Sequence, residues 1–204
     1  MIKAVIVDFD GVVYLENMRF STLLNSRFNI PDEKVMPFFR DELIRCQLGQ
    51  ADLKKELVKY IKTWQIKPTV EKLMEMWFEN GKINDALISI ISELKTKGII
   101  CILATDNEKY RMNYMIEKFS LERIFDKIVT SYDIGARKPN RKVYDFIFSS
   151  LNLKPRECLY FDDSEKNIEI GKKLGIKSYV FENNNEARKI IDKLEKRIES
   201  KAKE

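Results

Sequence analysis

The sequence contains no histidine among its 204 residues. This absence excludes histidine general-base chemistry, and with it the Ser-His-Asp triad. A zinc site is also disfavoured, because the three cysteines, Cys46, Cys101 and Cys158, form no close pair. Any catalysis must therefore use carboxylates, lysines or hydroxyl groups. We expect free thiols, with Cys101 and Cys158 inside apolar segments, as in a protein of a reducing compartment.

The sequence also lacks any apolar stretch near the roughly 20 residues that are needed to cross a membrane. Only a few apolar residues precede Asp8, too few for a secretory signal peptide. We therefore expect a cytoplasmic protein without a membrane partner. The net charge of +5 is spread over helices with acids interleaved, so no nucleic-acid partner is indicated. A mild positive charge suits a small anionic substrate.

Buried strands and amphipathic helices alternate along most of the chain. The segment KAVIVDF is short, β-branched and apolar on both faces, which is typical of a strand inside a parallel sheet. Further strands are predicted in IICILAT, FDKIVTS, ECLYFDD and IKSYVF, with helices between them and a charged helix over residues 185–204. This alternation predicts an α/β fold in which helices cover both faces of a parallel sheet.

Residues 18–81 show a different pattern. Apolar residues recur at helical spacing in FSTLLNSRF, VMPFFRDELIRCQL, LKKELVKYIKTW and VEKLMEMWF, and no strand pattern is evident. We expect an all-helical insertion over residues 16–82 and a core domain formed by residues 1–15 and 83–204. Trp64 and Trp77 lie at core-like positions of these helices, so we expect them to pack rather than to line a substrate pocket.

Polar side chains follow the predicted strands at the points where ligands bind to an open parallel sheet. They are Asp8 and Asp10, then Thr105, Asp106 and Asn107, then Lys138, and finally Asp162, Asp163 and Ser164. Residues i and i+2 of an extended chain point the same way, so the first two carboxylates should face one cavity. Acids at strand ends also cap helices or form turns, and this alternative applies to each residue taken alone.

The chemistry of these side chains suggests an anion and a cation bound together. Asp8, Asp10 and Asp163 would repel one another unless a cation joins them, and hard oxygen ligands favour Mg²⁺. The hydroxyl of Thr105, followed by backbone amides at a helix start, can hold a phosphate. It can equally cap that helix, with Glu108 completing a capping box.

Four segments, DFDGVV, ILATDN, GARKPN and YFDDSEKN, resemble in order and spacing the motifs of the haloacid dehalogenase-like hydrolase superfamily, and within it the phosphatase branch. The resemblance covers nearly the whole chain. It implies a Rossmann-like three-layer α/β/α core with a helical cap inserted between the first two motifs. Two departures are the added Asp106 and the presence of Asn167, where some relatives carry an acid.

The resemblance also implies catalytic roles. Asp8 would be the nucleophile that becomes an aspartyl-phosphate, and Asp10 the general acid/base. Thr105 would hold the phosphoryl group with the amides that follow it, including that of Asp106. Lys138 would also bind the phosphoryl group and stabilise charge in the transition state. The implied Mg²⁺ ligands are Asp8, the backbone carbonyl of Asp10, Asp163, and Asp162 either directly or through water.

The expected function is therefore Mg²⁺-dependent hydrolysis of a small phosphorylated metabolite. Asp10 favours phosphate chemistry, because true dehalogenases of this family lack an acid at that position. One alternative is a sugar phosphomutase or another phosphotransferase on the same scaffold, which would use the same aspartyl-phosphate but exclude water better. A non-catalytic binding module is the third hypothesis, and the intact set of site residues argues against it.

Overall fold

The centre of the molecule is a five-stranded parallel sheet. In this computed structural model, which describes residues 1–201, the strand order is β5-β4-β1-β6-β7. The strands are β1 (Ala4–Val7), β4 (Ile100–Thr105), β5 (Lys127–Thr130), β6 (Cys158–Asp162) and β7 (Lys177–Val180). Val7 of the central strand lies opposite Leu103 of β4 and Phe161 of β6. The five predicted strands are therefore confirmed, and they pair in parallel as expected.

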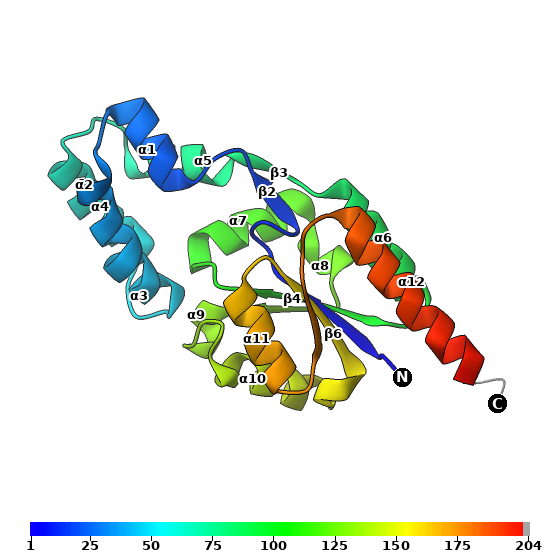
Figure 1. Cartoon of the computed structure of the whole chain (residues 1–204). Helices are drawn as coiled ribbons and strands as arrows, with labels where there is room; N and C mark the ends of the chain where they lie inside the picture. The colour runs from blue at the N-terminus through cyan, green and yellow to red at the C-terminus, as the bar shows by residue number, and fades with distance from the viewer. Residues whose placement is uncertain (202–204) are drawn as a thin grey trace.

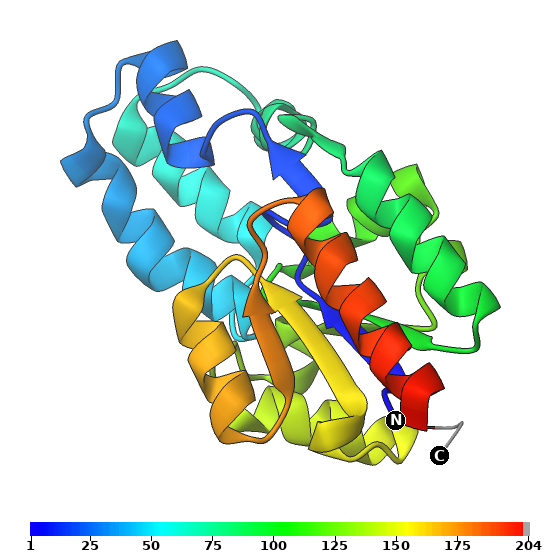
Figure 2. The same cartoon turned by 45° about the vertical axis from the view of Figure 1, so that its right-hand side comes forward.

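Helices cover both faces of this sheet (Figures 1 and 2). One face is covered by α6 (Asp85–Thr96), α7 (Lys109–Phe119), α8 (Leu121–Ile124) and α12 (Asn184–Lys201), and the other by α10 (Arg141–Leu151) and α11 (Glu165–Lys173). Side chains alternate along β1, so that Val5 and Val7 join the first buried cluster while Ala4 and Ile6 join the second. The predicted three-layer α/β/α fold is thus confirmed.

The regular structure between residues 20 and 78 is entirely helical. It consists of α1 (Phe20–Phe28), α2 (Asp32–Pro37), a π-helical turn (Phe38–Glu42), α3 (Leu43–Gln47), α4 (Leu53–Trp64) and α5 (Val70–Phe78). Figure 1 shows this group of helices beside the sheet and its covering helices. Trp77 stacks on Phe20 with ring centroids 4.5 Å apart, and Trp64 and Trp77 are both buried. The two tryptophans therefore pack in the core of the insertion, as expected.

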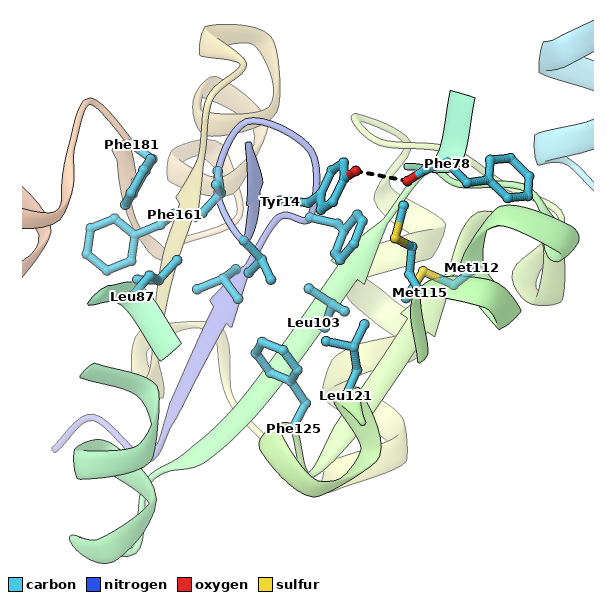
Figure 3. Close-up of a cluster of buried hydrophobic side chains, with 14 of the residues drawn as sticks. Tyr14, Phe78, Leu87, Leu103, Met112, Met115, Leu121, Phe125, Phe161 and Phe181 are labelled. Atoms are coloured by element: carbon cyan, nitrogen blue, oxygen red, sulfur yellow. Dashed lines mark hydrogen bonds between the residues drawn. The ribbon is translucent and has the colours of Figure 1, made fainter. Parts of the chain in front are cut away.

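A short antiparallel ribbon joins the helical insertion to the sheet. Its strands are β2 (Tyr14–Glu16) and β3 (Gly81–Ile83), and Leu15 lies opposite Lys82. The hydroxyl of Tyr14 donates to the carbonyl oxygen of Phe78 at 2.9 Å, which ties the ribbon to the end of α5 (Figure 3). The sequence does not predict this ribbon, because three residues per strand are too few to show a period of two. The predicted domain boundaries, near residues 16 and 82, fall within it.

Three further features concern the end of the chain, the membrane prediction and the thiols. The predicted charged helix is α12, and residues 202–204 lie outside the part of the chain that the structure describes. Within that part, the helices are too short or too polar to cross a lipid bilayer. Cys46, Cys101 and Cys158 are all buried and free, as the sequence predicts for the last two.

Candidate active site

The predicted site residues meet at the carboxyl ends of three neighbouring strands. β1 lies between β4 and β6, and ligands bind to open α/β sheets where the chain connections diverge in this way. Asp8 follows β1, Thr105 ends β4 and Asp162 ends β6. Lys138 reaches the same place from the loop between the short helix α9 (Ser131–Ile134) and α10. The topology thus converts four distant segments into one group of side chains.

Lys138 forms the charged centre of this group. Its Nζ donates to Asp8 Oδ1 at 2.6 Å, to Asp162 Oδ2 at 2.8 Å and to the carbonyl oxygen of Ala104 at 2.9 Å. Burial alone would lower the pKa of Lys138, but the carboxylates of Asp8, Asp162 and Asp106 together raise it above its ordinary value. Lys138 therefore stays protonated, and its three donors, directed to Asp8, Asp162 and Ala104, fix the ammonium beside the Asp8 carboxylate. It is not a solvated loop lysine.

Asp162 is fully buried and holds Lys138 from behind. Asp162 Oδ1 accepts from the backbone amide of Ser164 at 2.9 Å and from Asn167 Nδ2 at 2.9 Å. Its Oδ2 accepts from Asn167 at 3.1 Å, from the Tyr160 hydroxyl and from Lys138. These donors fix the Asp162 carboxylate, and the carboxylate in turn orients Lys138. Its predicted part in binding Mg²⁺ stays a prediction.

An acidic cluster beside Lys138 has the composition of a magnesium site. Asp8, Asp162 and Asp163 each offer a carboxylate oxygen, and these oxygens lie within 4.8 Å of one another. Burial raises the pKa of Asp8 and of Asp163; Asp162 raises both further, whereas Lys138 lowers both. A divalent cation would relieve this repulsion, and carboxylate oxygens are the ligands that Mg²⁺ prefers. The residues present therefore fit Mg²⁺.

Thr105 is the last residue of β4 and does not lie at the start of a helix. Its side chain is buried, and its Oγ1 accepts from Asn107 Nδ2 at 2.7 Å. Helix α7 begins at Lys109, and Glu108 caps it by accepting from two backbone amides of the first turn. The alternative in which Thr105 caps this helix is therefore wrong, because Glu108 performs that function itself. The predicted contact of the Thr105 hydroxyl with a phosphoryl group stays a prediction.

Asp106 directs its carboxylate to the loop that carries Lys138. Its Oδ1 accepts from the backbone amide of Lys138 at 3.0 Å, and its Oδ2 lies 3.8 Å from Arg137 Nε. Burial raises the pKa of Asp106, while Lys138 and Arg137 lower it. The side chain thus anchors the loop. The phosphate-binding role predicted for this residue would fall to its backbone amide and stays a prediction.

Asp10 is held by an arginine that the sequence patterns do not single out. Arg111 donates from Nη1 to Asp10 Oδ2 at 2.8 Å and from Nη2 to Asp10 Oδ1 at 2.6 Å, and Asn107 Nδ2 donates to Oδ2 at 2.7 Å. The available signal was its place in the helix: Arg111 shares the buried stripe of α7 with Met112 and Met115. A charged residue on such a stripe indicates a buried ion pair.

Comparisons with known proteins find phosphatases among the relatives of this chain. A phosphatase of Thermotoga maritima, named for phosphorylated carbohydrates, is 24% identical over 182 residues, which is 85% of this chain and 82% of the relative. A D-ribitol-5-phosphate phosphatase of Bacteroides thetaiotaomicron is 40% identical over 58 residues, but that match spans only 28% of each chain.

The fold and the family are established by two further findings. The solved structure of a haloacid dehalogenase family enzyme from Bacteroides thetaiotaomicron, in complex with magnesium and inorganic phosphate, superimposes with a TM-score of 0.76 at 16% identity. The match covers 88% of this chain and 94% of that one and shows a common fold. A family model described as haloacid dehalogenase-like hydrolase matches residues 5–181, so the chain belongs to the haloacid dehalogenase-like hydrolases.

Proposed function

We propose that this protein is a Mg²⁺-dependent phosphatase that hydrolyses small phosphomonoesters through an aspartyl-phosphate on Asp8. The observation that carries the proposal is the Asp8 carboxylate itself. It lies 2.6 Å from the ammonium of Lys138, beside a second carboxylate of the acidic cluster and two residues before Asp10. This set contains a nucleophile, a cation to offset its charge and an acid/base, and it needs no histidine.

In the first step, an Asp8 oxygen attacks phosphorus in line with the ester oxygen. The new bond joins Asp8 to phosphorus, and the bond between phosphorus and the ester oxygen breaks. Asp10, which takes up a proton before this step, gives it to the leaving oxygen, so the product departs as an alcohol. Lys138, whose three N–H groups donate to Asp8, Asp162 and Ala104, offsets the charge of Asp8 and of the phosphoryl group, and the Thr105 hydroxyl would hold a phosphoryl oxygen. Mg²⁺, when bound by the acidic cluster, supplies the charge that lets two anions approach each other.

In the second step, water hydrolyses the aspartyl-phosphate. Asp10, which lost its proton in the first step, takes a proton from the attacking water. The bond between phosphorus and Asp8 breaks, and inorganic phosphate leaves. The side chain of Asp10 is 41% exposed, so water can reach it. Access of water favours hydrolysis over the transfer to a second sugar that a phosphomutase performs.

The substrate class is proposed from the relatives. Two relatives are named for phosphorylated carbohydrates and for D-ribitol 5-phosphate, which are both polyhydroxylated phosphomonoesters. We therefore propose a sugar or polyol phosphate as the substrate. We also propose a cytoplasmic location, because three free thiols fit a reducing compartment.

The test is a panel of sugar and polyol phosphates with purified protein, with and without MgCl₂. We expect Mg²⁺-dependent release of inorganic phosphate and its loss in Asp8→Asn, which removes the nucleophile. Phosphorus NMR on the same reactions follows isomerisation. A wild-type protein that releases no phosphate from any member of the panel contradicts the proposal, and interconversion of sugar phosphates without free phosphate replaces it with a mutase.

A further inference from the structure

Arg111 is a buried cation that lies next to the proposed acid/base but faces away from solvent. Its side chain is 2% exposed, whereas that of its partner Asp10 is 41% exposed. The guanidinium therefore lies behind the Asp10 carboxylate, which presents its open side to solvent. Arg111 therefore acts on a substrate through its neighbours, and both of its terminal nitrogens donate to Asp10.

The contact between the two residues fixes a plane as well as a distance. Both oxygens of Asp10 accept from Arg111, at 2.8 and 2.6 Å, in a two-pronged pair. Such a fork defines the orientation of the carboxylate, which a single point charge cannot do. Asn107 is in contact with both members, since its amide nitrogen donates to Asp10 and its carbonyl oxygen accepts from Arg111 Nη1. Asp10 cannot rotate without breaking at least two of these bonds.

Arg111 also contacts the ribbon and the helical insertion. Arg111 Nη2 donates to Glu16 Oε1 of β2 at 3.0 Å. The guanidinium carbon lies 5.5 Å from the ring centroid of Tyr14, also in β2, and 5.9 Å from that of Trp77 in α5. Figure 3 shows Tyr14 bonded to Phe78 at the end of the same helix. The guanidinium thus bridges the sheet loop, the ribbon and the insertion.

We infer that Arg111 is a positioning residue, which holds Asp10 in the orientation needed for proton transfer. Through its contacts with β2 and α5, it also links that orientation to the position of the helical insertion. The inference rests on the proposed function, because it concerns the proton that Asp10 gives to the leaving oxygen. A buried arginine with two carboxylate partners is costly unless all three stay paired. The pairing explains why a charge occupies the apolar stripe of α7.

The test compares two leaving groups. An alkyl phosphate, such as ribitol 5-phosphate, needs a proton on its leaving oxygen, whereas p-nitrophenyl phosphate releases a stable anion. General acid catalysis contributes roughly 10²–10⁴-fold, so Arg111→Met should lower kcat/KM for the alkyl ester about 100-fold and for the aryl ester less than tenfold. Arg111→Lys keeps the charge but loses the two-pronged contact, so its kcat/KM for the alkyl ester should lie between those of the wild type and Arg111→Met. Arg141→Met on the exposed face of α10 is the matched control and should change neither.

A second variant shows whether Arg111 acts through Asp10. In an Asp10→Asn background, Arg111→Met should cause little further loss of kcat/KM, because the acid is already gone. If Arg111→Met does not fold, as judged by circular dichroism, Arg111→Lys and Glu16→Gln replace it. Glu16→Gln loosens the guanidinium and should lower the alkyl rate more than the aryl rate.

The outcomes separate the two proposals. An active wild-type enzyme in which the Arg111 variants slow both esters equally, or in which the losses from Asp10→Asn and Arg111→Met multiply, overturns the role of Arg111 and leaves the phosphatase proposal standing. A wild-type protein that hydrolyses neither ester, nor any member of the panel, overturns both.

Discussion

Gly11 lies directly against the carboxylate of Asp163. Gly11 has a φ of +76°, and a Cβ atom added there would lie 2.5 Å from Asp163 Oδ2. Gly98 has the same φ, but a Cβ added there would meet no atom within 4 Å. The two glycines therefore share one backbone conformation. They differ in that a side chain at position 11 would collide with Asp163, a candidate metal ligand, whereas a side chain at position 98 would meet no neighbour.

The first prediction uses this pair. Gly11→Ala should displace Asp163 and raise the Mg²⁺ concentration that gives half-maximal activity by at least tenfold. Gly98→Ala should cost about 1 kcal/mol of folding free energy from left-handed strain alone and leave the Mg²⁺ requirement unchanged. Magnesium titrations of activity and urea unfolding measure the two effects. Equal Mg²⁺ dependence in both variants would show that Asp163 is not a ligand.

The second prediction concerns the buried charges around Lys138. Lys138→Met leaves Asp8 and Asp162 close together without a cation, in a place where their side chains are 12% and 0% exposed. Breaking a buried pair in this way typically costs about 3–5 kcal/mol. Urea unfolding should show that loss, and activity should vanish. Adding Asp162→Asn should recover stability but not activity. A double variant as unstable as Lys138→Met would contradict the account.

A third prediction tests the side chain that holds Asp162. Asn167 donates to both oxygens of Asp162, at 2.9 and 3.1 Å. Asn167→Ala should loosen Asp162 and, through it, Lys138. Residues that orient metal or catalytic ligands typically contribute about 10–100-fold to activity, and we expect a fall in kcat of that size. Steady-state kinetics measure it, and an unchanged kcat would mean that the remaining donors, Ser164 and Tyr160, are sufficient.

Much of the site follows from sequence because its residues are fixed by the ends of strands. A short apolar segment followed by Asp8 locates one edge of the sheet, and the later segments that end in Thr105 and Asp162 must reach the same edge in a parallel fold. Arg111 could not be placed this way. Its contact with Asp10 spans 101 positions and depends on how α7 packs, which the order of strands does not determine.

The cap of α7 and the contact of Asp106 were not predicted correctly, because more than one residue or role fitted the sequence equally well. Thr105 and Glu108 can both cap a helix, and only the path of the chain decides that α7 begins after Glu108. In the sequence, the added Asp106 is predicted to belong to the segment that binds the phosphoryl group. In three dimensions its carboxylate faces the backbone of Lys138, in a segment 32 positions away.

The fourth prediction concerns the thiols and gives a pH dependence. Burial raises the pKa of Cys46, Cys101 and Cys158 to about 12, from an ordinary value of 9.0. In the folded protein the thiols therefore stay neutral, so at pH 8 they should react with a disulfide reagent far more slowly than after unfolding. Unfolded thiols ionise near pH 9 while folded ones do not, so their contribution to stability is complete below pH 9 and declines as pH rises toward 12. A rapidly modified thiol in native protein would contradict this burial.

The fifth prediction separates two roles of Asp106. If its carboxylate anchors the Lys138 loop, Asp106→Ala should lower kcat about tenfold, because the amide of Lys138 loses its acceptor and the ammonium is less well oriented. The inhibition constant of inorganic phosphate should change little, since the backbone amide of residue 106 is retained. If the carboxylate itself shapes the phosphate site, that constant should change by as much as kcat. Asp133→Ala is the control for general loss of structure, because it removes a carboxylate of α9 that accepts from the Thr130 hydroxyl and has no proposed role in catalysis. Product inhibition measured on the three proteins therefore assigns Asp106 either to the loop or to the ligand.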